Sequence, residues 1–273
     1  MGRKKVGLAL GSGAARGLAH IGVLTVLEKE GIPIDMIAGT SAGAAVGALY
    51  AQCKEVGEIR KLALDLGWRK LAPLVDASLP RSGFIKGKKL KDLLASCVGG
   101  DKEFSDLKIP LACVATDIDT GEEIVINQGP VLEAVRASIS LPVIFTVVKI
   151  GGRYLVDGGL VNPVPVSVVK QMGADFIIAV NVIPDVADRT HHRVGGKRGG
   201  GLKEPNIFHV VMQSINIATY AFVASSLEEA DAVIEPSVAH IGPGEFRHAR
   251  ELILQGELAA HRAISEIKRK LRA

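Results

Sequence analysis

Two hydrophobic patterns alternate along the chain: short uninterrupted apolar runs, and longer stretches in which apolar residues recur every three or four positions. The first pattern is typical of buried β-strands, and the second of helices that cover a sheet. Their alternation predicts an α/β fold with a largely parallel central sheet flanked by helices. The predicted strands span residues 6–10, 36–39, 111–117, 124–127, 143–149, 154–157 and 176–182.

A pair of glycines indicates a tight turn between two of these strands, and helical periodicity follows most of the others. Gly151 and Gly152 stand between two predicted strands and indicate a hairpin. Helices are expected after Gly13 and after Ser41, and over residues 86–97, 131–138, 166–172, 205–229 and 249–271.

Two stretches depart from this alternation. Residues 185–203 are polar, basic and glycine-rich, which predicts an exposed flexible loop. Its His191 and His192 lack further ligands nearby, so the loop is interpreted as solvated and not as a metal site. Residues 68–85 mix large apolar residues with prolines and glycine, and they are too apolar for an ordinary surface loop.

Length and composition limit the class of protein. A chain of 273 residues with 48% hydrophobic and 23% charged residues can form one sizeable core. We expect a single domain over residues 1–273, with the motif-bearing core at about 6–183 and a C-terminal helical segment at 205–273. The net charge of +4 is too small to indicate nucleic-acid binding, but it allows weak attraction to an anionic membrane surface.

The N-terminal residues and the cysteines bear on the cellular compartment. The basic residues 3–5 precede an apolar run that glycines, Arg16 and His20 interrupt, which fits neither a signal peptide nor a membrane span. Cys53, Cys97 and Cys113 lack paired spacing, which favours three reduced, buried side chains. The expectation is a cytoplasmic protein that is free to contact the inner membrane surface peripherally.

A candidate nucleophile lies in the sequence GTSAG at residues 39–43, between a predicted strand and an alanine-rich helical stretch. A serine in such a tight turn projects its hydroxyl outward, and the flanking glycines avoid clashes within the turn. The following helix N-terminus supplies backbone N–H groups where an oxyanion would form. Ser41 is therefore a candidate nucleophile, the alternative being a serine that only caps the helix.

A glycine-rich loop, GSGAARG at residues 11–17, also lies between a predicted strand and a helix. A dinucleotide-binding loop requires a third glycine where Arg16 stands, so that interpretation is rejected. The backbone N–H groups of such a loop suit a tetrahedral oxyanion. Because the helix dipole disfavours a cation in the first turn, Arg16 is expected to have a partner or an orienting role, a solvated arginine being the alternative.

The third candidate is Asp157, which ends a predicted strand and is followed by Gly158 and Gly159. Two glycines allow the turn after the aspartate to approach another loop closely. Taken alone, this sequence fits equally well a turn-forming Asp-Gly without a chemical role.

Together and in this order, the glycine-rich loop, the serine turn and the Asp-Gly-Gly turn make the chain resemble the patatin-like phospholipase family. The sequence ASISLPVIF at residues 137–145 also resembles the family's segment between serine and aspartate. The resemblance spans about residues 6–183, and its scale is most similar to the small bacterial members. It implies a patatin-like three-layer α/β architecture.

The resemblance also implies a serine-dependent lipid acyl hydrolase with a Ser-Asp dyad, acting on lipid or other acyl esters without a metal or organic cofactor. Ser41 would be the nucleophile and Asp157 the base; with an ordinary pKa near 3.9 the aspartate would be a weak base, suited to esters. Ser12 and Ala14 stand where some members have glycine, so the choice of oxyanion amides is not fixed. The residues implied for oxyanion or substrate binding are Gly11, Ser12, Gly13, Ala14, Arg16 and Ala42, and the glycines implied to support the turns are Gly17, Gly39, Gly43, Gly158 and Gly159.

Two other interpretations are compatible with the sequence. An α/β-hydrolase with a Ser-His-Asp triad shares the serine turn, although the histidines after Asp157 lie in the glycine-rich loop, in a helix or near the C-terminus. A regulatory binding protein could retain the fold, because fold alone does not define function. Beside an acyl-chain site, residues 68–85 would either form a mobile apolar cover or complete the core. The residues carry no signal for an oligomeric state.

Overall fold

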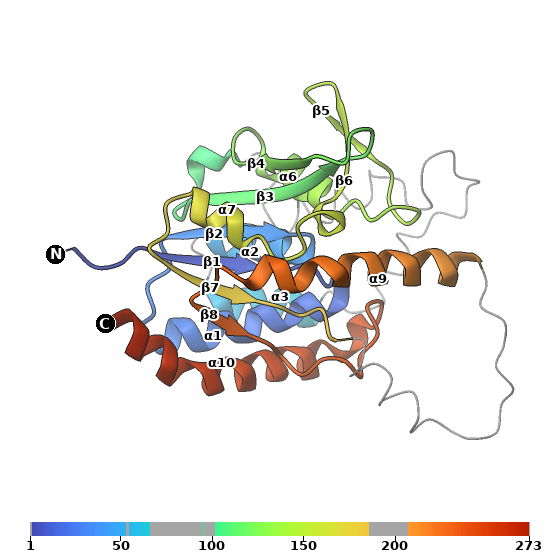
Figure 1. The fold of residues 1–273 in the computed structure, drawn as a ribbon. Coiled ribbons are helices and arrows are strands. Elements are labelled where there is room, and N and C mark those ends of the chain that lie inside the picture. Colours follow the sequence, from blue (N-terminus) through green and yellow to red (C-terminus); the bar gives the residue numbers. More distant parts are fainter. Residues whose placement is uncertain (1, 53–54, 66–94, 96–101, 186–206, 273) are drawn as a thin grey trace, which may run out of the picture.

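The computed structural model describes residues 2–52, 55–65, 95, 102–185 and 207–272 (Figure 1). Three predicted features lie outside the described residues, except for Ala95 in the first of them and Asp185 in the second. They are the helix at 86–97, the loop at 185–203 with His191 and His192, and the apolar segment 68–85. Among the helices of the described ranges, none combines the length and apolar character needed to cross a membrane.

One eight-stranded sheet forms the centre of the molecule (Figure 1). Its strands are β1 (Val6–Leu10), β2 (Met36–Thr40), β3 (Leu111–Asp117), β4 (Glu123–Ile126), β5 (Val148–Ile150), β6 (Arg153–Asp157), β7 (Phe176–Val180) and β8 (Ala232–Ile234). The order is β5-β6-β3-β2-β1-β7-β8, with β4 paired to β3 off this path. Along this order, each strand from β3 through β2, β1 and β7 to β8 runs parallel to its neighbour. Strands β4 and β6 run antiparallel to β3, and β5 runs antiparallel to β6. The predicted largely parallel sheet is confirmed.

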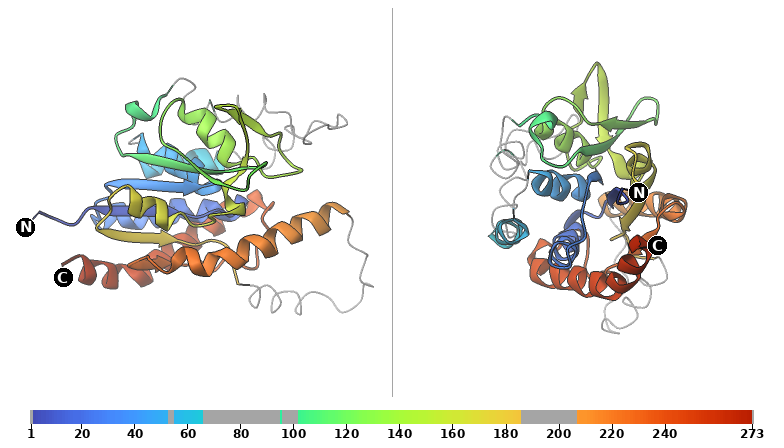
Figure 2. Two further views of the ribbon diagram at one scale, coloured as in Figure 1. Left: turned by 45° about the horizontal axis from the view of Figure 1, so that its top comes forward. Right: turned by 90° about the vertical axis from the view of Figure 1, so that its left-hand side faces the viewer.

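Helices cover both faces of this sheet and complete three layers (Figure 2). The α-helices are α1 (Ala19–Lys29), α2 (Ala42–Ala51), α3 (Val56–Asp65), α6 (Val131–Ser138), α7 (Val166–Gln171), α9 (Ile207–Leu227) and α10 (Ala249–Arg272). In β1, Leu8 and Leu10 pack in the cluster that contains α1, α2 and α10, whereas Ala9 packs with α7. Successive strand residues point to opposite faces, so a sheet covered on both sides requires the uninterrupted apolar runs of the sequence.

Most predicted elements within the described residues match the observed ones to within two residues at each end, and the predicted hairpin at Gly151 and Gly152 is confirmed by the β5–β6 pairing. The strand predicted at 143–149 is wrong over residues 143–147, since β5 begins at Val148. Val143 has a φ of 72°, and the Phe145 N–H donates to the Leu141 carbonyl at 3.0 Å, so this part forms a turn. Helix α3 and strand β8 are absent from the prediction.

Helices α1 and α10 cross with their backbones in contact. A methyl group built on Gly22 would lie 1.9 Å from the Ile253 carbonyl oxygen, and one on Gly256 would lie 1.9 Å from the Ala19 carbonyl oxygen. Any larger residue would force the two helices apart. The contact holds the first turns of α10 against α1 and against the 3₁₀ helix η1 (Ala14–Leu18) that leads into it.

We expect Gly256→Ala to lower the free energy of unfolding by about 1–3 kcal/mol, because the added carbon overlaps a backbone carbonyl of α1. Gly57→Ala in α3 is the matched control, since an added carbon there meets no heavy atom within 4 Å. Alanine should stabilise that helix by up to about 1 kcal/mol. Urea denaturation measures both changes, and equal unfolding midpoints for the two variants would contradict the close helix contact.

Candidate active site

Ser41 lies in the predicted turn between β2 and α2, and only 7% of it is exposed. Its φ of 55° and ψ of −117° cost about 1–3 kcal/mol in a residue with a side chain. Two glycines make the turn sterically possible. A methyl group on Gly43 would lie 2.0 Å from the Leu10 carbonyl oxygen, and one on Gly39 would lie 2.6 Å from the Ala44 Cα.

Strand pairing brings Asp157 to Ser41. Thr40 pairs with Val114 of β3, and the next residue of β3, Ala115, pairs with Asp157 at the end of β6. Ser41 and Asp157 therefore lie level with each other on either side of β3. The Ser41 hydroxyl donates a hydrogen bond to Asp157 Oδ2 at 2.5 Å.

The turn after β6 holds the Asp157 carboxylate in place. The Gly159 N–H donates to Asp157 Oδ1 at 2.8 Å, and the Thr116 hydroxyl donates to the Asp157 carbonyl at 2.9 Å. A methyl group on Gly158 would lie 2.3 Å from the Val114 carbonyl oxygen, so this turn passes directly against β3. The glycines after the aspartate thus permit the close backbone approach that the sequence predicted.

Burial raises the pKa of Asp157 to about 6 from an ordinary value of 3.8, although hydrogen bonds from Ser41 and Gly159 oppose the rise. A carboxylate with this pKa is still mostly ionised at pH 7, and it accepts a proton more readily than an exposed aspartate. The expectation of a weak base with an unshifted pKa is therefore wrong, because the sequence does not reveal the burial.

Ser138, the last residue of α6, fixes the serine turn. Its Oγ accepts the Ser41 N–H at 2.8 Å, and its hydroxyl donates to the Val114 carbonyl at 2.6 Å. Thr40 adds a second anchor, since its hydroxyl donates to the Asn162 carbonyl at 2.9 Å. The motifs did not predict the part played by Ser138, whose only signal was its place in the segment 137–145.

Two amides at the start of the glycine-rich loop are already paired within the fold. The Gly11 N–H donates to the Val180 carbonyl at 3.0 Å, and the Ser12 N–H donates to the Pro163 carbonyl at 2.8 Å. Neither N–H group is therefore available to an oxyanion, which removes the amides of Gly11 and Ser12 from the candidate donors.

Three other amides near the serine have no acceptor within the described parts of the chain: those of Gly13, Ala14 and Ala42. Gly13 has a φ of 168° and a ψ of 8°, and Ala14 has a φ of 50°, so the loop turns sharply between them. Ala42 begins α2, where N–H groups lack partners inside the helix. These three groups are the candidate oxyanion donors.

Close approaches join the three motifs into one site. A methyl group on Gly17 would lie 2.3 Å from the Ala42 Cβ, so the loop packs against the start of α2. A methyl group on Gly159 would lie 2.9 Å from the Ser12 Oγ, so the Asp-Gly-Gly turn packs against the same loop.

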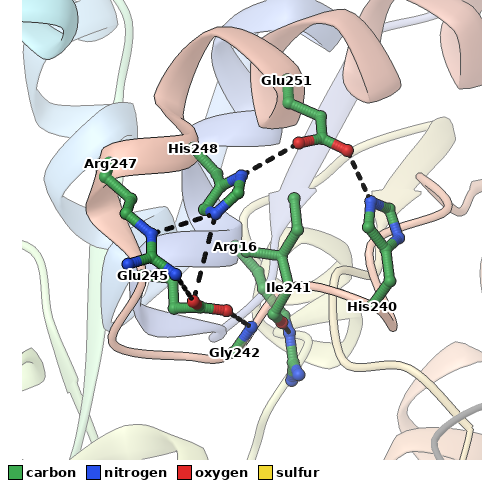
Figure 3. A network of polar contacts seen from close by, with 8 residues as sticks. All are labelled: Arg16, His240, Ile241, Gly242, Glu245, Arg247, His248 and Glu251. Atoms are coloured by element: carbon green, nitrogen blue, oxygen red, sulfur yellow. Dashed lines mark hydrogen bonds and ion pairs between the residues drawn. The ribbon is translucent and has the colours of Figure 1, made fainter. Parts of the chain in front are cut away.

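Arg16 is buried, with 7% exposed, and its Nε donates to the Ile241 carbonyl at 2.7 Å (Figure 3). The alternative of a solvated surface arginine is therefore wrong, and the expected partner is a backbone carbonyl. Because Arg16 lies within η1, the contact ties the glycine-rich loop to the segment before α10.

Three of the described histidines, His20, His240 and His248, have other partners. Burial lowers the pKa of His20 to about 4, so its ring is neutral at pH 7, and its Nε2 hydrogen-bonds to the Gly11 carbonyl at 2.8 Å. His240 and His248 both contact Glu251. Among the side chains that the structure describes, no histidine hydrogen-bonds to the candidate nucleophile or its carboxylate partner.

Other reactive groups are few in the described ranges. No group of three or more histidine, cysteine, aspartate or glutamate side chains there could hold a metal ion. Cys113 is free and buried, and burial raises the pKa of its thiol to about 12. A thiol with this pKa is protonated at neutral pH and is a poor nucleophile. Cys53 and Cys97 lie outside the described residues.

The fold and the meeting of these three turns define an α/β protein with a candidate serine–aspartate site. Over residues 8–170 the sequence matches the family described as Patatin-like phospholipase, and the chain belongs to this family. The resemblance found in the motifs is thereby confirmed.

Individual relatives extend this comparison. An uncharacterized NTE family protein of Mycobacterium tuberculosis is 38% identical over 178 residues, which cover 65% of this chain and 49% of that protein. Lysophospholipase NTE1 of Candida glabrata is 34% identical over 245 residues, which cover 88% of this chain and 14% of that protein. This chain thus spans half or less of the length of these relatives. The solved structure of VipD from Legionella pneumophila shares the fold, with a TM-score of 0.57 at 14% identity over 96% of this chain and 67% of that chain.

We expect the rate at which a fluorophosphonate labels Ser41 to rise with pH around an apparent pKa near 6 and to level off above it. Below this pKa the Asp157 carboxyl is protonated and cannot accept the serine proton, so labelling is lost as the pH falls. Rates measured from about pH 4.5 to about pH 8.5 give the profile. Asp119→Asn, an exposed carboxylate in the turn after β3, is the control and should not change it. A rate that stays constant down to the lowest pH would argue against the buried base.

We expect Ser41→Gly to be more stable than Ser41→Ala by about 1 kcal/mol, because glycine adopts this φ and ψ without strain. Both variants lack the hydroxyl, so their difference reports the backbone alone. Chemical denaturation of the pair measures it. If alanine proves as stable as glycine, the serine turn is not strained.

Proposed function

We propose that this chain is a serine-dependent lipid acyl hydrolase, a phospholipase or esterase that cleaves carboxylic esters through an acyl-enzyme. The observation that carries the proposal is the hydrogen bond from the buried Ser41 hydroxyl to Asp157, at the point where two glycine-rich turns meet. Membership of the Patatin-like phospholipase family supports a lipid substrate. So does the 34% identity to a protein named as a lysophospholipase.

In the first step, the Ser41 oxygen attacks the ester carbonyl carbon while its proton passes to Asp157 Oδ2, which already accepts that proton's hydrogen bond. The carbonyl oxygen becomes an oxyanion, and the N–H groups of Gly13, Ala14 and Ala42 are the proposed donors to it. Each such donor is worth about 3 kcal/mol in comparable sites. Collapse of the intermediate expels the alcohol, which takes the proton back from the carboxyl group.

In the second step, water hydrolyses the acyl-enzyme. The Asp157 carboxylate accepts a proton from the attacking water, and the same amides stabilise the second oxyanion. The serine oxygen leaves and regains its proton from Asp157. The fatty acid is released, and the free enzyme returns without a metal or organic cofactor taking part in either step.

The raised pKa of Asp157 is what makes a carboxylate suitable for this cycle. A base with a pKa of about 6 is ionised at neutral pH before the attack, and its conjugate acid gives up the proton readily to a leaving alkoxide. An amine must be protonated before the C–N bond breaks, whereas an alkoxide leaves with less assistance, so esters are the proposed substrates in preference to amides.

A Ser-His-Asp esterase and a regulatory binding protein are the alternatives. The triad would need one of the histidines whose side chains lie outside the described set, His191, His192 or His209. A binding protein would not need the Ser41 hydroxyl to react. We further propose a cytoplasmic enzyme that meets its lipid substrate by transient contact with a membrane surface.

We expect Ser41→Ala and Asp157→Asn each to lower hydrolysis of short-chain esters by about 10³-fold or more, because each removes an essential part of one acyl-transfer unit. Far-UV circular dichroism should show that both variants remain folded. A screen of phospholipids, lysophospholipids, glycerides and acyl thioesters with wild type and Ser41→Ala would identify the substrate.

The alternatives give different results in the same experiment. Replacing His191, His192 and His209 by glutamine, one at a time, should leave substantial activity. Loss of activity in one folded histidine variant would favour the triad. Absence of both fluorophosphonate labelling and hydrolysis in wild type would favour the binding protein.

A further inference from the structure

A polar cluster outside the catalytic pair touches the glycine-rich loop from the segment before α10. It consists of His240, Ile241, Gly242, Glu245, Arg247, His248 and Glu251 (Figure 3). The cluster lies 80 or more residues after Asp157 in sequence, beyond the region that matches the family. Neither of the two catalytic side chains belongs to it.

Two consecutive bonds join this segment to η1. The Ile241 carbonyl accepts from Arg16 Nε at 2.7 Å, and the Pro243 carbonyl accepts from the Ala15 N–H at 2.9 Å. Ala15, Arg16 and Ile241 are all buried, with 0%, 7% and 1% exposed, so water competes little for these bonds. The position of residues 241–243 therefore sets the position of the residues that follow Gly13 and Ala14.

Two glutamates restrain residues 240–243 by hydrogen bonds. Glu251 in the first turn of α10 contacts His240 Nε2 at 2.7 Å and His248 Nδ1 at 3.0 Å. Glu245 accepts the Gly242 N–H at 2.7 Å and also pairs with Arg247 at 2.6 Å. His240 directly precedes Ile241, so the bond to Glu251 restrains the carbonyl that holds Arg16.

The cluster is not explained by metal binding or by global stability. None of its groups forms a set of three or more metal-ligating side chains among the described residues. The side chains of His240, His248 and Glu251 are 32%, 36% and 42% exposed, and ion pairs at such exposure add little to folding stability. The bonds from His240 and His248 lower the pKa of Glu251, so its carboxylate is ionised at neutral pH and can hold both rings.

We propose that Glu251 is a positioning residue for the oxyanion loop, acting through His240 and Ile241 on Arg16 and so on the N–H groups of Gly13 and Ala14. The proposal rests on the proposed function of the Ser41 site. Small displacements of oxyanion donors cost far more in turnover than in substrate binding, because the donors act on charge that exists only in the transition state. Loss of Glu251 should therefore reduce kcat and leave KM nearly unchanged.

The test compares Glu251→Ala with Glu266→Ala, which lies on the same helix and loses only an exposed pair with Lys270. Hydrolysis of p-nitrophenyl butyrate gives kcat and KM, and hydrogen exchange of residues 11–18 reports the loop without any need for catalysis. We expect Glu251→Ala to lower kcat about tenfold, with KM within about twofold, and to speed exchange in the loop. Glu266→Ala should change none of these. Glu251→Gln, which keeps one acceptor oxygen, should lie between wild type and Glu251→Ala.

Unchanged loop exchange in Glu251→Ala, or a rise in KM at constant kcat, would overturn the proposal. So would faster exchange spread evenly over the sheet and α1, since that pattern marks lost stability and not lost positioning. If wild type hydrolyses no ester but the loop still responds to Glu251→Ala, the proposed function fails while the link from Glu251 to the loop stands.

Discussion

The hydrogen bond between Ser41 and Asp157 exists because β3 holds β2 along one edge and β6 along the other in a fixed register. A slip of one residue between β3 and β6 would turn the aspartate to the opposite face of the sheet. Two hydrogen bonds help to fix this register. The Val114 carbonyl receives the Ser138 hydroxyl, and the Thr116 hydroxyl holds the Asp157 carbonyl. The geometry of the site thus depends on β3, although β3 places no nucleophile or carboxylate in the site.

The burial that raises the pKa of Asp157 also opposes folding. Its pKa is higher in the folded chain than in the unfolded one, so the folded state loses stability as the pH rises from about 4 to about 6. At neutral pH the cost is about 3 kcal/mol. His20 has the reverse dependence, because its pKa is lowered to about 4 and stability is lost as the pH falls below about 6.5. The apolar packing of the sheet must therefore offset Asp157 at neutral pH, whereas His20 opposes folding only at acidic pH.

The sequence was sufficient for the sheet, for the helices that immediately follow its strands, and for the three turns that carry the site. These features depend on local periodicity and on glycines at positions of close approach, which a single sequence displays. Strand β8 was missed because three residues are too few to show a pattern, and residues 143–147 were wrong because Val143 adopts a φ that its type disfavours.

The parts of the site that escaped prediction depend on contacts between residues far apart in the chain. Ser138 reaches Ser41 across 97 positions, and Arg16 reaches Ile241 across 225. Such pairings follow from tertiary packing, and the local composition around each residue does not indicate them. The raised pKa of Asp157 belongs to the same class, because desolvation is a property of the assembled core.

The crossing of α1 and α10 has a consequence for the two ends of the described chain. Because α10 starts beside the glycine-rich loop and then runs the full length of α1, it ends near the start of β1, where the Lys4 ammonium donates to the Lys270 carbonyl at 3.1 Å. Both ends therefore lie together, away from the carboxyl end of β2 where Ser41 stands (Figure 1). An affinity tag, a fused domain or a tether to a solid support at either end would therefore lie at the end of the molecule opposite Ser41.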